Sequence, residues 1–135
     1  MFVLCVRQAK KSGFVFGAYS HCKWPVRKDG GRVADPSGQS FLFSLTNTTG
    51  QAVRLSLHKK DGAILLNIYG VFFGEDNANF ALYVNDKAFD GDRGNVATPP
   101  KNCAYQPDDG DLTRGVEFFA GEEYFAAADI EVYEL

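Results

Sequence analysis

The chain has 135 residues and a formal net charge of −3, with acidic and basic residues dispersed along it. This length suits one domain, expected over residues 1–135, and the dispersed charge offers no basic surface for nucleic acid. Twelve Phe, six Tyr and one Trp favour pleated β structure, and no run approaches the roughly 18 apolar residues needed for membrane insertion as a helix.

The first third of the chain predicts a hairpin followed by a long loop. Residues 2–8 are apolar and β-branched, as in a strand, and residues 14–19 have the character of its return strand. A polar turn that ends in Gly13 joins them. Residues 20–38 are rich in Pro and Gly and predict a loop, within which Trp24 is expected to close one end of the core.

Two strands with a clear alternation follow. Residues 40–45 predict the first of them, and residues 52–57 predict the second after a polar connection. In the second strand Val53, Leu55 and Leu57 share one face, while polar residues occupy the other. The alternation predicts a sheet with one buried face and one face in contact with solvent.

The second half of the chain is less regular. Residues 63–69 fit either a strand or a short helix, residues 80–84 predict a strand, and residues 85–114 have the composition of a long loop. A short stretch of strand pairing is expected to interrupt this loop around residues 102–105. From residue 129 onward polar and apolar residues alternate, which predicts a closing strand that buries at least one face.

These elements together predict the fold class. No segment shows sustained helical periodicity over a dozen residues, whereas six to eight short strands are separated by turn signals. We therefore expect an all-β or β-rich α+β domain. Its architecture is predicted to be an antiparallel two-sheet β-sandwich with long loops and little helix.

An ordered set of short motifs resembles the TLDc domain over residues 2–135. Its most diagnostic parts are the aromatic-glycine pairs before Trp24 and the closing segment from Ala-Gly121 to Ile-Glu-Val-Tyr133. TLDc domains usually carry an amino-terminal helical portion before the first hairpin, and this chain begins at that hairpin. An acidic residue usual after the second Phe-Gly is matched only loosely, by Glu75-Asp76 or by Phe80-Ala81. We expect either a reduced domain or a partner that supplies the missing surface.

The resemblance implies a fold of two stacked antiparallel sheets and a non-catalytic interaction module. It implies roles in oxidative-stress resistance and in binding the vacuolar-type proton ATPase, with no catalytic residue and no cofactor. Most matched positions are interpreted as backbone geometry and core packing. Glu131 is the polar exception, interpreted as a contact residue or as the partner of a backbone donor. The matched positions are Gly17, Trp24, Phe41, Gly70, Gly74, Gly121 and Glu131.

The cysteines offer one redox hypothesis and no metal signature. Cys5, Cys22 and Cys103 are odd in number, lie far apart and form no C-x-x-C pair, which indicates a cytoplasmic or other reducing intracellular compartment. Redox sensing by Cys22 is one hypothesis, because the neighbouring Lys23 favours its thiolate. Ordinary packing is the alternative, since free Cys is often buried. The spacing to other thiols and imidazoles supports no metal site.

Two acidic clusters suggest calcium, but turn chemistry explains them as well. Residues 90–92 and 108–111 combine Asp with Gly, and neither cluster has the alternating ligands and closing Glu of an EF-hand. Asp and Gly dominate tight turns for backbone reasons alone, so we interpret both clusters as turns.

Two classes of function remain. The leading hypothesis is a non-catalytic protein-interaction module, whose partner is the vacuolar-type proton ATPase or another large assembly that holds it as a structural subunit. The alternative is a β-sandwich that binds a small ligand, a carbohydrate or calcium, and it would use Trp24, Tyr105 and the acidic loops.

Overall fold

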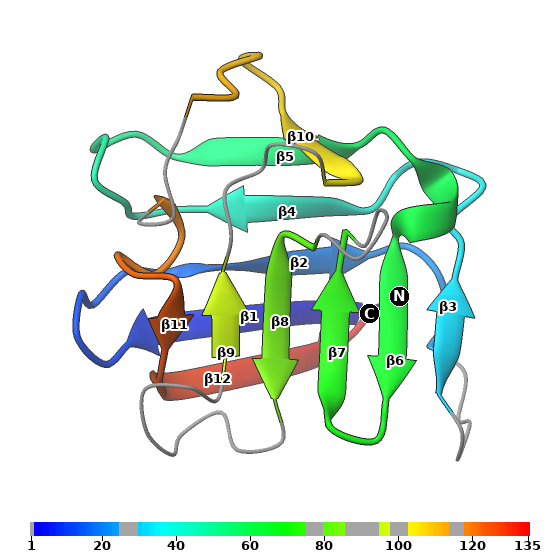
Figure 1. Ribbon diagram of the computed structural model, residues 1–135, viewed down its shortest axis with the longest axis horizontal. Coiled ribbons are helices and arrows are strands. Elements are labelled where there is room, and N and C mark those ends of the chain that lie inside the picture. The colour runs from blue at the N-terminus through cyan, green and yellow to red at the C-terminus, as the bar shows by residue number, and fades with distance from the viewer. Residues whose placement is uncertain (1, 25–29, 75–79, 86–94, 98–102, 114–117) are drawn as a thin grey trace.

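The computed structural model describes residues 2–24, 30–74, 80–85, 95–97, 103–113 and 118–135. Within these residues twelve strands form two six-stranded antiparallel sheets, and the strands of one sheet run across those of the other (Figure 1). The structure adds a short 3₁₀ turn, η1 (Lys60–Gly62). The predicted all-β, antiparallel two-sheet sandwich with little helix is therefore confirmed. Among the described residues no helix is long and apolar enough to span a membrane.

The first sheet has the strand order β10-β5-β4-β2-β1-β12. The predicted opening hairpin is confirmed, and its return strand begins at Phe16 because residues 9–14 form the tight turn. The alternation predicted for β5 is also confirmed, since Leu55 and Leu57 are buried while Arg54 is exposed. The strands of this sheet are β1 (Phe2–Ala9), β2 (Phe16–Ser20), β4 (Phe41–Ser44), β5 (Val53–Leu57), β10 (Tyr105–Pro107) and β12 (Ala127–Glu134).

The second sheet has the order β11-β9-β8-β7-β6-β3. The ambiguous segment 63–69 contains a strand, β6, because it pairs on both sides with β7 and β3. Strands β3 and β9 lie in segments predicted to be loop. Both are three residues long, and pairing with neighbouring strands stabilises them where the local sequence does not. The strands are β3 (Gly31–Val33), β6 (Ile64–Asn67), β7 (Gly70–Phe73), β8 (Leu82–Asn85), β9 (Asn95–Ala97) and β11 (Tyr124–Phe125).

The hydrophobic core fills the space between the two sheets. Aromatic rings dominate it, and the ring of Phe16 lies 5.2 Å from that of Phe125 and 5.7 Å from that of Phe119 between centroids. Such edge and tilted contacts are typical of packed aromatic side chains. The largest fully buried side chains are Tyr105, Phe16, Phe73, Phe118, Phe119, Phe125, Leu42, Leu55, Ile64 and Leu82.

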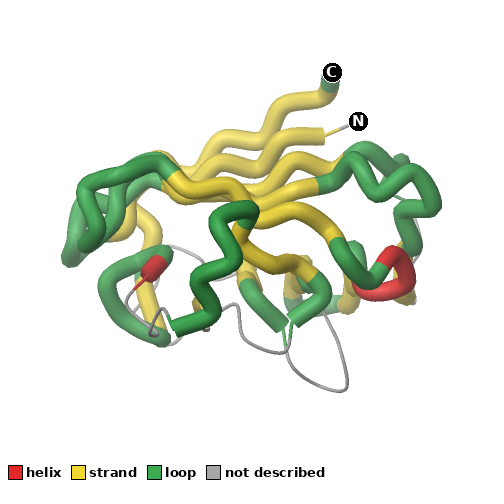
Figure 2. The backbone as a smooth tube through the Cα atoms, turned by 90° about the horizontal axis from the view of Figure 1, so that it is seen from above, coloured by secondary structure: helices red, strands yellow, loops and turns green. Residues whose placement is uncertain are grey.

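The prediction that β12 buries one face holds for its first part, where Ala127 is buried and Ile130 packs against the core, but not for its end. Val132 pairs with Leu4, and Leu4 pairs with the buried Ala18, so this register places Val132 on the core-facing side of the sheet. Val132 is nevertheless 55% exposed, and Tyr133 on the opposite face is 48% exposed. The reason is visible in Figure 2, where the ends of β1 and β12 curve away from the second sheet.

Candidate functional site

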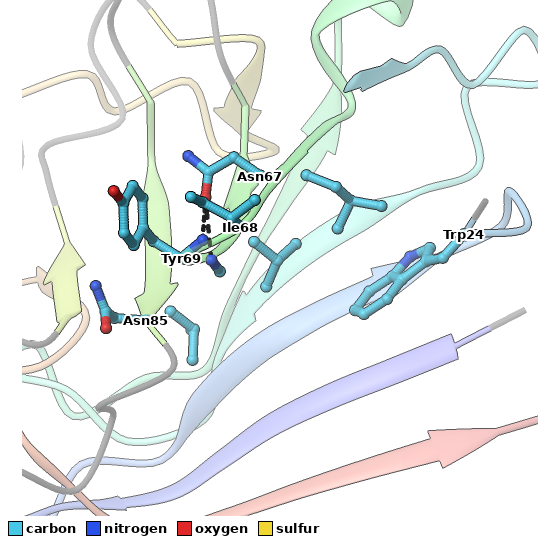
Figure 3. A pocket seen from close by; sticks show the side chains of 9 residues that line it. Trp24, Asn67, Ile68, Tyr69 and Asn85 are labelled. Carbon is cyan, nitrogen blue, oxygen red and sulfur yellow. Dashed lines mark hydrogen bonds between the residues drawn. The ribbon is translucent and has the colours of Figure 1, made fainter. Parts of the chain in front are cut away.

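An open groove of about 410 Å³ lies where Trp24 faces the hairpin between β6 and β7 (Figure 3). Nine described residues line it, and none of them is charged. Asn67 and Asn85 contribute the amide groups, and the rest of the lining is apolar, aromatic or glycine. The lining therefore suits an uncharged and mainly apolar group. The nine residues are Trp24, Leu66, Asn67, Ile68, Tyr69, Gly70, Val71, Val84 and Asn85.

The tip of the β6–β7 hairpin presents two large apolar side chains to solvent. Ile68 is 70% exposed and Tyr69 is 58% exposed. The Asn67 Oδ1 atom accepts hydrogen bonds from the backbone N–H groups of Tyr69 at 2.8 Å and Gly70 at 3.0 Å, which fixes the turn. Tight turns usually carry Gly, Asn or Asp at such positions. The sequence analysis missed this exposed Ile-Tyr pair, and the usable signal for a turn was the flanking Asn67 and Gly70.

Gly70 allows the hairpin to lie close to the neighbouring strand. A Cβ atom on this residue would lie 2.1 Å from the backbone oxygen of Val84, which is far inside contact distance. Because β7 pairs with β8 through Gly70 and Asn85, a larger residue would push the two strands apart. The sequence interpretation of Gly70 as a residue required by backbone geometry agrees with this contact.

Trp24 belongs both to the groove and to the end of the core. Its ring centroid lies 5.1 Å from that of Phe2 and 6.2 Å from that of Phe73, a core residue. The prediction that Trp24 closes one end of the core is confirmed. Its indole Nε1 is buried and has no hydrogen-bond partner in the described part of the chain. A buried donor left in this state costs about 1–3 kcal/mol. The binding role of Trp24 stays a prediction.

Tyr105, the second aromatic residue proposed for binding, lies inside the core. Its side chain is fully buried, and its hydroxyl donates a hydrogen bond to the backbone oxygen of Ala63 at 3.1 Å. Burial raises the pKa of Tyr105, and the nearby charges of Cys22 and Asp35 act in the same direction. A ring without exposed surface offers nothing to a sugar or an ion, so the predicted ligand contact does not fit this structure.

Glu131 lies on β12 and takes no part in the groove. It is half-buried, and its Oε2 atom accepts a hydrogen bond from the Tyr133 hydroxyl. These two residues share the face of the first sheet that points away from the core, because side chains alternate along a strand. The structure therefore does not bring Glu131 together with Trp24, and its role as a contact residue stays a prediction.

Cys22 lies beside polar groups and is partly buried. Its Sγ atom is 3.3 Å from the Ser20 Oγ atom, while Cys103 is buried. The imidazole of His21 forms a hydrogen bond with the Tyr19 hydroxyl at 3.2 Å. Among the described residues no group of three or more His, Cys, Asp or Glu side chains could hold a metal ion. Redox sensing by Cys22 stays a prediction.

The acidic cluster at residues 108–111 uses its carboxylates in local turns. Asp109 Oδ1 accepts a hydrogen bond from the backbone N–H of Asp111 at 3.0 Å. Asp111 Oδ1 accepts from the backbone N–H and from the hydroxyl of Thr113. These bonds agree with the interpretation as turn chemistry. The other acidic cluster, at residues 90–92, lies outside the described residues.

Asp35 is a buried carboxylate. The sequence predicted only that it lies in a loop rich in turns. It accepts hydrogen bonds from the backbone N–H and hydroxyl of Ser37 and, at 2.8 Å, from the backbone N–H of Ser40. Burial alone would raise the pKa of Asp35, but these bonds outweigh it and lower the pKa to about 2. Asp35 thereby fixes the loop that leads into β4.

Asp35 should make the protein sensitive to acid. Its pKa falls from 3.8 to about 2 on folding, so the stabilisation is fully present above about pH 4 and is lost as the pH falls toward 2. The shift corresponds to about 2 kcal/mol. Urea unfolding between pH 2 and pH 6 should show that the free energy of unfolding of the wild type falls as the pH is lowered. Asp35→Asn should lack this pH-dependent part of the stability. If the free energy of unfolding changed with pH in the same way for both proteins, Asp35 would not be the source of the acid sensitivity.

Comparison with protein families gives a match that extends over the whole chain. A family model described as the TLDc domain matches residues 1–135, which includes both sheets and the groove. Curated proteins give no match to the chain. The match agrees with the resemblance found in the ordered sequence motifs.

Proposed function

The chain belongs to the TLDc domain family, and from this membership we propose that it is a non-catalytic protein-interaction module. Its role is in oxidative-stress resistance, and its partner is a protein assembly, with the vacuolar-type proton ATPase as the first candidate. A permanent place as a structural subunit of another large assembly is the second form of the same proposal. Family membership supports the role in oxidation resistance, and the groove supports binding.

The observation that carries the proposal is the exposed apolar tip beside an uncharged groove. Ile68 and Tyr69 project from a turn fixed by Asn67, so little conformational entropy is lost when a partner covers them. Tyrosine is among the residues that contribute most to binding energy at protein interfaces. A partner with an apolar ridge would contact the tip and place that ridge in the groove.

The lining of the groove supports binding rather than chemistry. General acid–base catalysis needs a group that exchanges protons near the working pH, placed within hydrogen-bond reach of a substrate. The nine described lining residues include no Asp, Glu, His, Lys or Cys. Asn67 and Asn85 supply amides that recognise backbone or other neutral polar groups.

The proposal is tested by capture from native cells combined with cross-linking mass spectrometry. Ile68→Asp should reduce recovery of the partner at least about tenfold, because it places a charge in an apolar contact. Leu45→Asp is the matched control, since Leu45 is 52% exposed and lies outside the groove. Equal recovery with both variants, or no stoichiometric partner with the wild type, would contradict the proposal.

The identity of the captured protein distinguishes the two forms of the proposal. Cross-links to the peripheral sector of a proton ATPase would support the first candidate partner. Stable cross-links to an unrelated assembly would mean that the domain serves as a structural building block there.

The alternative, a site for a small ligand, is favoured by the size of the groove. Its volume of about 410 Å³ falls within the range typical of small-molecule sites. The uncharged lining suits a neutral ligand such as a carbohydrate better than it suits calcium, which prefers carboxylate oxygens. A rise in melting temperature with a glycan panel, but without any protein partner, would favour this alternative.

A further inference from the structure

Asn67 and Trp24 offer hydrogen-bond donors, rather than acceptors, to an occupant of the groove. The Oδ1 atom of Asn67 already accepts from the backbone N–H groups of Tyr69 and Gly70, so its Nδ2 amide is the group that remains for an occupant. The indole of Trp24 is a donor only, and its buried Nε1 atom has no partner in the described part of the chain. An occupant should therefore bring acceptors.

The lining of the groove is elongated. Figure 3 shows Trp24 at one end of it and Tyr69 and Asn85 at the other. Val71 and Val84 also line the groove, and because both are buried they supply an apolar base. The lining carries no charge. An apolar base between two aromatic side chains suits an extended segment with uncharged, apolar side chains.

The donors distinguish between the conformations that such a segment can adopt. The carbonyl groups inside an α-helix are bonded to N–H groups of the helix itself, so a helix brings few acceptors. A β-strand brings acceptors but also an N–H donor at every residue, and Asn67 Oδ1 is already occupied by the turn. A polyproline II segment has carbonyl groups without internal hydrogen bonds, and its proline residues have no N–H. Only the last of these brings acceptors without adding donors.

We propose that the groove binds a proline-rich segment of the partner protein in the polyproline II conformation. A carbonyl oxygen of the segment accepts from Asn67 Nδ2, and its proline rings pack on Trp24 and on the apolar base. A carbonyl at the Trp24 end supplies the acceptor that the indole lacks among the described residues. Aromatic-lined grooves bind such segments because the polyproline II helix is already formed before binding. The inference rests on the proposed function, since it names the part of the partner that enters the groove.

The test uses two blocked, uncharged peptides of equal length with the full chain. One repeats the sequence Pro-Leu-Pro-Ser, and the other has alanine in place of every proline. The proline peptide should bind at least about tenfold more tightly by isothermal titration calorimetry. It should also slow amide hydrogen exchange in the β6–β7 hairpin and leave exchange in β12 unchanged. Equal affinity for the two peptides, no binding, or no protection of the hairpin would overturn the proposal.

A matched pair of variants tests the donor at Asn67. Asn67→Asp keeps the oxygen that holds the turn and replaces the amide donor by a charged acceptor. It should weaken binding of the proline peptide at least about tenfold, because a carbonyl oxygen would then face a carboxylate. Leu45→Asp adds the same charge at an exposed residue outside the groove and should leave binding unchanged. Thermal melts establish that both variants are folded. Equal effects of the two variants would overturn the proposal.

Capture of the partner and binding of the peptide separate this inference from the proposed function. If Ile68→Asp abolished capture but neither peptide bound, the groove would bind its partner by other means, and the inference would be overturned while the proposed function stood. If the proline peptide bound at the hairpin but Ile68→Asp left capture unchanged, the inference would hold for the groove and the proposed function would be contradicted.

Discussion

Replacing Phe16 by alanine is expected to lower the free energy of unfolding by about 3–5 kcal/mol. Phe16 is fully buried, and its ring contacts those of Phe119 and Phe125, which lie more than a hundred positions later in the sequence. The substitution removes these contacts and leaves a cavity between the sheets. Natural domains are stable by only about 5–15 kcal/mol, so this loss would be a large fraction of the total.

Urea unfolding of the wild type and of Phe16→Ala measures this loss of stability. Leu45→Ala is the control, because Leu45 is about half exposed and its truncation should change stability by no more than about 0.5 kcal/mol. A loss below about 1 kcal/mol for Phe16→Ala would mean that the ring is not a central part of the core.

Gly70→Ala is expected to cost about 2–3 kcal/mol, because the new methyl group would overlap the backbone oxygen of Val84. That oxygen belongs to the main chain of β8 and cannot turn aside as a flexible side chain would. Strands β7 and β8 would separate, and the hairpin tip with Ile68 and Tyr69 would shift. We therefore expect the substitution to weaken capture of the partner as well as stability.

Gly50→Ala separates the steric effect at Gly70 from the general effect of replacing glycine. Gly50 has a positive φ of 72°, but a Cβ atom there would meet nothing within 4 Å. Its substitution should cost only about 1–2 kcal/mol, for the left-handed backbone conformation, and should leave capture of the partner intact. If both variants retained the partner equally, Gly70 would have no role in positioning the tip.

The asparagine at the base of the hairpin shows why the tip can serve as a recognition element. Asn67 holds two backbone N–H groups, so the turn keeps its shape although Ile68 and Tyr69 are poor turn residues. One polar side chain fixes the local order of the turn, and the two exposed residues are those that the proposed partner would contact.

Local patterns in the sequence predicted the fold class and most strands. The alternation of β5, the opening hairpin and the turns at Gly-containing segments depend on neighbouring residues, and side-chain periodicity records such local geometry directly. The position of Trp24 at the end of the core was also predictable. A single large aromatic side chain in a polar loop has few other ways to leave water.

Only the tertiary structure decided which residues meet. The groove joins Trp24 to a hairpin more than forty positions away, and Tyr105 is buried because β10 pairs with β5. Strand β12 has the alternation of a half-buried strand, yet Val132 is exposed because the second sheet does not cover it. Burial depends on which distant segments pack against a residue. A pattern within one segment determines its conformation and its faces, but not whether another layer lies over them.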